Sequence, residues 1–195
     1  VNFTVNGKKL KIDNKTGLPE GWRRGKLGDI LELSYGRALK EGDRTGKGYP
    51  VVGSSGIVGY HEEYLAEGPG IVVGRKGSMG TVIWIEDDFF PIDTTFYVID
   101  KLCAGGLFFH LFVLKSFDFQ RVGSDSAVPG LNRNSAYSLE LPIPKVEIIK
   151  EYNNTVAPMF HKMKSNNLQI QTLSKLRDLL LPKLMKGEIR VKNEV

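Results

Sequence analysis

The change in character after "LPIPK" (Leu141 to Lys145) constrains the fold more than any other feature of this sequence. The chain has 22 glycines, and Gly187 is the only one beyond this point. From there to Leu181 the sequence reads as helix, and Pro158 is expected to end or kink one helix and to start another. Pro182 and Gly187 are expected to stop the second helix. We therefore predict a strand-rich globular part followed by a helical part.

The second predicted helix carries one apolar seam with a single polar interruption. Its members follow steps of three or four residues: Phe160, Met163, Asn167, Ile170, Leu173, Leu176 and Leu180. A helix from Pro158 to Leu181 would be about 36 Å long, which favours a partner helix. Asn167 is the kind of polar residue that fixes register in a helix pair. The alternative is a helix packed on its own domain, with Asn167 at the edge of the contact.

The part before Leu141 consists mostly of short apolar runs between glycine, proline and aspartate clusters. Valine, isoleucine, tyrosine, phenylalanine and threonine dominate these runs, which is typical of strands. They are "DILELSYG", "YPVVG", "GIVVG", "TVIWI" and "TFYVID". The run from Gly105 to Phe119 is apolar at helical spacing and predicts a mostly buried helix. Residues 1–17 contain the turn pair Asn6 and Gly7 and predict a hairpin or an arm.

Together these patterns predict an α/β (α+β) domain with a mostly β core, followed by a long helix. We expect an arm at 1–17, a globular domain at 18–144 and a helix region at 145–195. With 195 residues, 41% of them hydrophobic and 25% charged, the chain can bury one core with an appended element. The single cysteine, Cys103, excludes an internal disulfide framework and a cysteine-based zinc site.

The charge is weakly basic and unevenly distributed. The net charge is +5, and residues 61–144 carry 6 Lys/Arg against 11 Asp/Glu, so the basic excess lies towards the two ends. Within this acidic middle, Arg75 and Lys76 are the only charges between Ile71 and Ile85. The balance leans towards nucleic acid. No membrane span or export signal is visible, so we expect a cytoplasmic protein.

Two glycine triplets share G-x-x-G-x-x-G spacing, one at Gly53, Gly56 and Gly59, and the other at 74–80. Neither matches a dinucleotide fingerprint, which needs a helix directly after the loop, nor a phosphate-binding P-loop. Aromatic and β-branched residues follow both triplets, so they are expected to lie between strands. Such loops suit either tight turns or close contact with the backbone of a ligand.

The second triplet, "GRKGSMG", has contents suited to nucleic acid. Arginine can bind guanine or phosphate, lysine and serine anchor phosphates, and methionine can wedge a base step. Two more polar clusters, "PIDTTFYV" and "SAVPGLNRN", lie further along the chain. From local patterns alone, structural turns with solvated charges explain all of these segments equally well.

The sequence shows no catalytic constellation. His61, His110 and His161 are scattered, and none has a metal-ligand spacing. His110 lies within "FFHLF" and is expected to be a satisfied core histidine. The carboxylates at 86–88 are expected to form a solvated turn. The methyltransferase loop of Asn/Asp-Pro-Pro-Tyr type is absent, so we expect no enzyme, no metal and no cofactor in this chain.

Six blocks, taken together and in order, resemble the specificity subunit of type I restriction-modification enzymes. They are "LPEGW", "YPVVGSSGIVGYHEEYL", "VVGRKGSMGTV", "PIDTTFYV", "AVPGLNR" and "LSKLRDLLLPKLMKGEIRV". The resemblance covers about Leu18 to Val191. It implies a target-recognition domain that reads one half of a split DNA sequence, and a spacer helix that forms an antiparallel coiled coil and docks methyltransferase subunits.

Carried over by position, the resemblance implies a set of DNA-contact candidates. They are Ser54, Ser55, Tyr60, Arg75, Lys76, Ser78, Met79, Thr94, Thr95, Asn132 and Arg133. It also implies double-stranded DNA, adenine methyltransferase subunits and a restriction subunit as partners. S-adenosylmethionine would belong to the methyltransferase, which would flip and methylate an adenine.

The chain departs from the common pattern of this family, because it has one recognition domain and one spacer helix where a full subunit has two of each. Either it is a half-subunit that forms a homodimer and reads a palindromic split target, or it is one half of a longer chain.

The residues also leave several different functions open. A recognition subunit of a type IIB or fused restriction system would differ in its partner. A non-modifying module could bind single strands or RNA, and a coiled-coil adaptor would carry the globular domain only incidentally. A nucleotide hydrolase is the least favoured, because the chain has no phosphate-binding P-loop.

Overall fold

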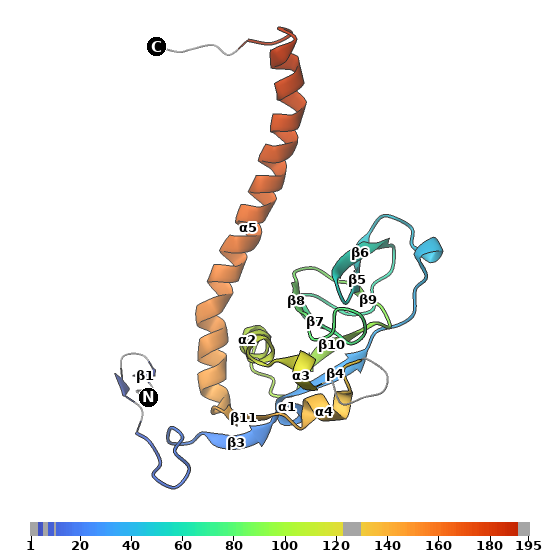
Figure 1. Cartoon of the computed structure of the whole chain (residues 1–195). Helices are drawn as coiled ribbons and strands as arrows, with labels where there is room; N and C mark the ends of the chain where they lie inside the picture. Colours follow the sequence, from blue (N-terminus) through green and yellow to red (C-terminus); the bar gives the residue numbers. More distant parts are fainter. Residues whose placement is uncertain (1–3, 6–7, 10, 123–129, 191–195) are drawn as a thin grey trace. The chain divides into compact units, whose positions relative to one another are not determined.

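The computed structural model describes residues 4–5, 8–9, 11–122 and 130–190 (Figure 1). The chain divides into two compact units, Val1–Asn154 and Thr155–Val195. The first unit holds the sheets and short helices, and the second holds most of one long helix. The structure is therefore a mixed α/β domain with a sheet core, followed by a long C-terminal helix, and this confirms the predicted fold class.

The largest sheet has four antiparallel strands in the order β4-β10-β7-β8. These strands are β4 (Leu31–Tyr35), β10 (Thr95–Asp100), β7 (Gly70–Gly74) and β8 (Val82–Ile85). Every residue of β7 is buried, which its continuous apolar run predicts for a central strand. Four of the five predicted strands are therefore confirmed in this sheet.

A second sheet has the order β6-β5-β9. Strand β5 (Tyr49–Gly53) pairs antiparallel with β6 (Gly56–His61) and parallel with β9 (Phe90–Pro91). The fifth predicted strand is thus also confirmed. Val52 of β5, Val72 of β7 and Ile85 of β8 form one buried core cluster with Ala66 and Phe89, which pair in an isolated bridge. This cluster joins the two sheets into one unit. A 3-10 turn, η1 (Glu41–Asp43), precedes β5.

Strands from the two ends of the first unit pair with each other. Strand β3 (Arg23–Lys26) lies antiparallel to β11 (Glu140–Ile143). Helix α1 (Leu27–Ile30) directly follows β3, and helix α4 (Arg133–Tyr137) lies shortly before β11. The Asp29 carboxylate accepts a hydrogen bond from the Lys26 backbone N–H at 2.9 Å. This bond, with the Arg23 side chain, lowers the pKa of Asp29.

The helix predicted over 105–119 is shorter in the structure. Helix α2 (Phe108–Ser116) is followed by a separate α3 (Phe119–Val122). Gly105 and Gly106 have φ of 72° and 150°, which is not helical, so α2 cannot begin before them. The predicted N-terminal hairpin is present as β1 (Thr4–Val5) and β2 (Lys8–Lys9).

The sequence predicts that Pro158 ends or kinks one helix and starts another. The predicted end and new start are wrong, because α5 (Val146–Met185) is one helix of 40 residues with Pro158 and Pro182 inside it. A proline removes one N–H donor from the intrahelical ladder, and the hydrogen bonds of the flanking turns carry the helix across that gap. Gly187 performs its predicted role: its φ is 72° and its N–H bonds to the Leu184 carbonyl at 3.0 Å.

The compact first unit continues past the predicted boundary at 144. Helix α5 begins at Val146, but Ile149 and Asn153 are buried in the first unit, which extends to Asn154. Across the described ranges, no helix combines the length and the apolar character that a membrane crossing requires.

Candidate nucleic-acid interface

Loops that are far apart in sequence meet at the backbone carbonyl of Thr94. The backbone N–H groups of Arg75 and Lys76 donate to this oxygen at 2.9 and 3.0 Å, and the Ser54 hydroxyl donates to it at 2.6 Å. The Leu131 N–H donates in turn to the Arg75 carbonyl at 2.8 Å. The structure thus brings together the β5–β6 turn, the β7–β8 loop, the β9–β10 connection and the segment before α4. We call this assembly the loop cluster.

Three of the candidate side chains use their polar groups for bonds within the protein, Ser54 and Thr95 in buried positions and Asn132 at the surface. Ser54 is only 7% exposed, and Thr95 is fully buried, with its hydroxyl donating to the Ile92 carbonyl at 2.8 Å. The Asn132 side-chain oxygen caps α4 by accepting from the Asn134 N–H at 2.8 Å. Because these groups are already bonded inside the protein, they shape the loops in this conformation.

Other candidates lie at the surface. Lys76, Ser78 and Ser55 are exposed, and Arg75, Met79, Thr94 and Arg133 are half-buried. Tyr60 is 44% exposed on β6, where it pairs with Pro50, and no described hydrogen bond links it to the loop cluster. The structure therefore places Tyr60 on a different segment from the basic side chains. Ala127 to Pro129, in the "AVPGLNR" block, lie outside the described residues, as does the end of the chain from Val191.

The sequence reasoning missed Tyr35, an aromatic residue at the end of β4. This residue is 49% exposed, and its ring lies close to two arginines, with the guanidinium carbon of Arg75 5.1 Å and that of Arg133 4.9 Å from the ring centroid. Arg75 also lies 5.8 Å from the centroid of Phe96 and donates from Nη1 to the Asp93 carbonyl at 3.0 Å. An aromatic residue before glycine and arginine, as in "SYGR", was the available signal, but strand propensity alone explains a tyrosine there.

Among the residues that the structure describes, the basic side chains of the loop cluster form no ion pair with a carboxylate. In the part of the chain that the structure describes, ion pairs form elsewhere, such as Arg23 with Asp29 and Lys47 with Glu62. None of those described pairs includes Arg75, Lys76 or Arg133. A surface with guanidinium and ammonium groups and no compensating carboxylate attracts anions.

Glycines of the second triplet are required by the turn itself. A Cβ at Gly74 would overlap the Ser78 carbonyl oxygen, and one at Gly80 would lie 2.5 Å from the Phe119 Cβ, at a φ of 77°. Tight internal packing therefore accounts for both positions. Close approach of a ligand backbone to the same loop stays a prediction.

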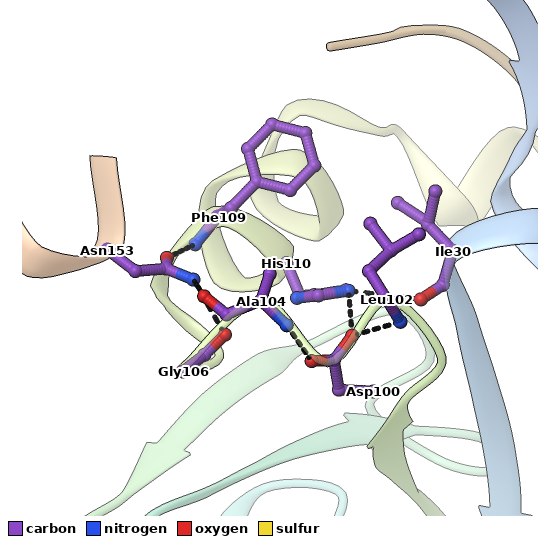
Figure 2. Close-up of polar contacts among 8 residues, drawn as sticks. All are labelled: Ile30, Asp100, Leu102, Ala104, Gly106, Phe109, His110 and Asn153. Carbon is purple, nitrogen blue, oxygen red and sulfur yellow. Dashed lines mark hydrogen bonds and ion pairs between the residues drawn. The ribbon is translucent and has the colours of Figure 1, made fainter. Parts of the chain in front are cut away.

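A buried polar network lies around Asp100, at the end of β10 opposite to Thr95 (Figure 2). The His110 ring is fully buried, and its Nε2 lies 3.1 Å from the Ile30 carbonyl and 3.3 Å from the Asp100 carboxylate. The Asp100 carboxylate also accepts from the backbone N–H groups of Leu102 and Ala104, at 2.7 and 2.9 Å. His110 is thus the predicted core histidine, although its Nδ1 has no hydrogen-bond partner among the described residues.

Asn153 connects the start of α5 to the same region. Its side-chain oxygen accepts from the Phe109 N–H at 3.0 Å, and its amide nitrogen donates to the carbonyls of Ala104 and Gly106, both at 2.9 Å (Figure 2). Asn153 is 1% exposed, and its bond to the Ala104 carbonyl is buried, while the other two bonds are partly buried.

Metal chemistry finds no support in the described ranges, where His, Cys, Asp and Glu form no group of three that could hold an ion. The carboxylates at 86–88 form part of a turn, in which Asp88 accepts a hydrogen bond from the Gly68 N–H at 2.8 Å.

The apolar side chains of α5 beyond Asn154 are mostly exposed. Of the predicted seam, Met163, Ile170, Leu173 and Leu176 are 47–63% exposed, Asn167 is exposed, and Phe160 and Leu180 are half-buried. At about 100° per residue, the seven seam positions spread over about 200° around a straight helix. Met159, Leu168, Leu179 and Leu181 are also more than half exposed, so apolar surface extends beyond the predicted seam.

Comparison with known proteins identifies a family. A family model described as the type I restriction modification DNA specificity domain matches residues 19–175. The chain is 36% identical over 80 residues to the MjaIX specificity subunit of Methanocaldococcus jannaschii, over 41% of this chain and 18% of that protein. It is 25% identical over 131 residues to the EcoprrI specificity subunit of Escherichia coli, over 64% of this chain and 32% of that protein.

Solved structures share the fold. The S subunit of a type I restriction-modification system from M. genitalium matches with a TM-score of 0.69 at 22% identity, over 85% of this chain and 46% of that one. The HsdS subunit from Thermoanaerobacter tengcongensis matches with a TM-score of 0.53 at 15% identity, over 91% and 48%. The chain thus spans less than half the length of these relatives. Because the family model covers most of its residues, the chain belongs to the type I restriction-modification DNA specificity family.

Proposed function

We propose that this chain reads one half of a bipartite duplex DNA target for a type I restriction-modification system. The observation that carries the proposal is the loop cluster, in which hydrogen bonds at the Thr94 and Arg75 carbonyls gather basic loops on one part of the recognition unit. Its cations lack carboxylate partners among the described residues, which suits a polyanion. Membership of the specificity family supports the same reading.

The side chains of the loop cluster divide into two roles. Lys76 and Ser78 are exposed on the β7–β8 loop and suit phosphate oxygens, which fix the position and register of the protein on DNA. Met79, on the same loop, suits apolar contact with a base or a base step. Ser54, Thr95 and Asn132 shape the loops, so substitutions there would act on DNA binding indirectly.

The long helix α5 is proposed to pair with another spacer helix and to dock the methyltransferase. Its exposed leucines and methionines support this, because an apolar surface of this length needs a partner in water. The partner would bind S-adenosylmethionine, flip the adenine and transfer the methyl group. A restriction subunit would join the same complex. The second half of the target would be read by a second copy or by another recognition domain.

Methylation mapping tests this proposal directly. The chain is co-expressed with the methyltransferase encoded beside it in a host without other systems, and the genome is sequenced for modified adenines. A split palindromic motif is the expected result if two copies pair, and a split asymmetric motif would mean that a different second recognition domain is required. No new methylation, with both proteins soluble and associated, would overturn the proposal.

A triple variant separates recognition from assembly. Arg75→Ala/Lys76→Ala/Arg133→Ala is expected to abolish the motif while the complex with the methyltransferase still purifies intact. Arg24→Ala, an exposed arginine on β3 outside the loop cluster, serves as the control and should keep the motif. Methylation that persists unchanged in the triple variant would show that the loop cluster does not contact DNA.

A further inference from the structure

Two arginines from different segments lie over one exposed aromatic ring. Arg75 follows β7, Arg133 begins α4, and their guanidinium carbons lie 5.1 and 4.9 Å from the Tyr35 centroid. An aromatic ring attracts cations at its face. Since the two distances share one centroid, the two charged groups cannot be further apart than the sum of these distances.

This arrangement is anchored on both sides by hydrogen bonds. The Tyr137 hydroxyl, on the same helix face as Arg133, accepts from the Leu33 N–H at 2.9 Å and thereby fixes α4 to β4. On the other side, Nη1 of Arg75 donates to the Asp93 carbonyl at 3.0 Å. The Leu131 N–H bonds directly to the Arg75 carbonyl, so the two arginine-bearing segments are joined. Both guanidiniums are therefore positioned before any ligand arrives.

The charge of this group points to an anion rather than to a neutral base edge. Both guanidiniums lie beside the same ring, and neither forms an ion pair with a carboxylate in the described part of the chain. Their combined positive charge favours a ligand that carries negative charge. Arg75 is also folded back onto Tyr35 and Phe96, whereas an arginine that reads guanine must extend its fork into the groove.

We propose that Arg75 and Arg133 together bind the phosphodiester backbone of one DNA strand, and that Tyr35 is the positioning residue that holds the two guanidiniums for it. This inference rests on the proposed DNA-reading function. It means that the two arginines contribute to affinity for DNA of any sequence. Phosphate contacts of this kind release counterions and make affinity depend on salt. Base readout would then belong to other side chains of the loop cluster.

The test measures binding of the full chain to two labelled duplexes of equal length, one AT-rich and one GC-rich, over a range of salt concentrations. Arg75→Ala/Arg133→Ala is expected to lower the slope of log K against log salt by about 2 on both duplexes, because each lost phosphate contact contributes about 0.9. Tyr35→Leu, which keeps apolar bulk without a ring, is expected to weaken binding to both by about 3- to 10-fold. Tyr35→Phe keeps the ring and should stay within about twofold of the wild type.

Matched controls come from the same chain. Tyr64 is 44% exposed, close to the 49% of Tyr35, and packs against Tyr49 instead of a cation, so Tyr64→Leu should bind as the wild type does. Arg24→Ala removes one positive charge elsewhere and should leave the slope unchanged.

Several outcomes would overturn the inference. One is wild-type affinity in Tyr35→Leu, and another is an unchanged salt slope in the double arginine variant. A loss confined to the GC-rich duplex would mean that the arginines read guanine. A wild-type chain that binds neither duplex would instead contradict the proposed function itself, so the two failures are distinguishable.

Discussion

At the scale of single residues, His110 makes stability depend on pH. Burial of the ring lowers its pKa below the ordinary value of 6.5, an effect that outweighs the opposing influence of the Asp100 carboxylate and the Ile30 carbonyl. The folded protein therefore holds the neutral ring, while the unfolded chain takes up a proton as the pH falls through 6.5. Because the unfolded state binds more protons there, the free energy of unfolding rises with pH.

We therefore expect the wild-type chain to lose stability as the pH falls below 6.5, by up to about 1.4 kcal/mol per pH unit, until the lower pKa of the folded protein is reached. Urea unfolding at a series of pH values measures this change. His110→Gln, which keeps a donor for the Ile30 carbonyl, should show a flatter dependence. Asp29 does not interfere, since its lowered pKa places its titration below 3.8. An equally steep dependence in the variant would assign the effect to another group.

The contrast between Arg75 and Tyr35 shows what residue types alone reveal about a site. Arg75 stands among glycines in a stretch poor in charge, so its isolation marked it as a candidate. Tyr35 ends a strand, where a tyrosine is common, so the sequence does not mark it as a site residue. Only the fold, which places Arg75 and Arg133 over its ring, makes it a candidate. Ser54 and Thr95 illustrate the reverse case, in which the sequence suggests a ligand contact that the fold does not leave free. Their hydroxyls already donate to backbone carbonyls inside the loop cluster.

At the scale of elements, Asn153 binds the first turns of α5 to α2 and to the loop before it. Asn153→Ala would leave the carbonyls of Ala104 and Gly106 and the N–H of Phe109 without this partner in a buried place. We expect a loss of about 2–4 kcal/mol in the free energy of unfolding, measured by urea denaturation. Asn154→Ala, its exposed neighbour on the same helix, should change stability by less than about 0.5 kcal/mol. Equal effects of the two substitutions would contradict the role of the buried amide.

Strands were predictable here because their apolar runs are short and flanked by turn residues, as at "GIVVG". Helix ends were harder. The rule that proline stops a helix failed at Pro158. A proline removes one hydrogen bond locally, but the other hydrogen bonds of a long helix can offset that loss, and the sequence around the proline does not show this. At Gly105 and Gly106 the helix is shorter than predicted, because their backbone angles, which the sequence does not reveal, are not helical and α2 begins after them. The pairing of β3 with β11 joins segments more than a hundred residues apart, beyond the reach of any local pattern.

At the scale of the whole molecule, the exposed apolar surface of α5 predicts self-association. Ile170 and Leu173 are 59% and 63% exposed, and burying them against a second copy would remove much apolar area from water. We expect the full chain to sediment as a dimer and Ile170→Asp/Leu173→Asp to sediment as a monomer. Gln171→Asp/Lys175→Asp places two carboxylates on roughly the opposite face and should remain a dimer. A wild-type chain that is monomeric at micromolar concentration would count against self-pairing.

The ladder between β3 and β11 fixes the two ends of the segment that lies between these strands. Ile143 lies opposite Arg23 and Glu140 opposite Lys26, so the chain enters and leaves the segment between them at neighbouring points. The distance between these two points is set by the ladder and not by what lies between them. A recognition segment of different length and different loops could therefore replace most of residues 27–139, provided that it kept the backbone groups that hold Asn153 near the start of α5. The fold is arranged as a cassette, in which the reading surface can be exchanged while the frame that carries it stays the same.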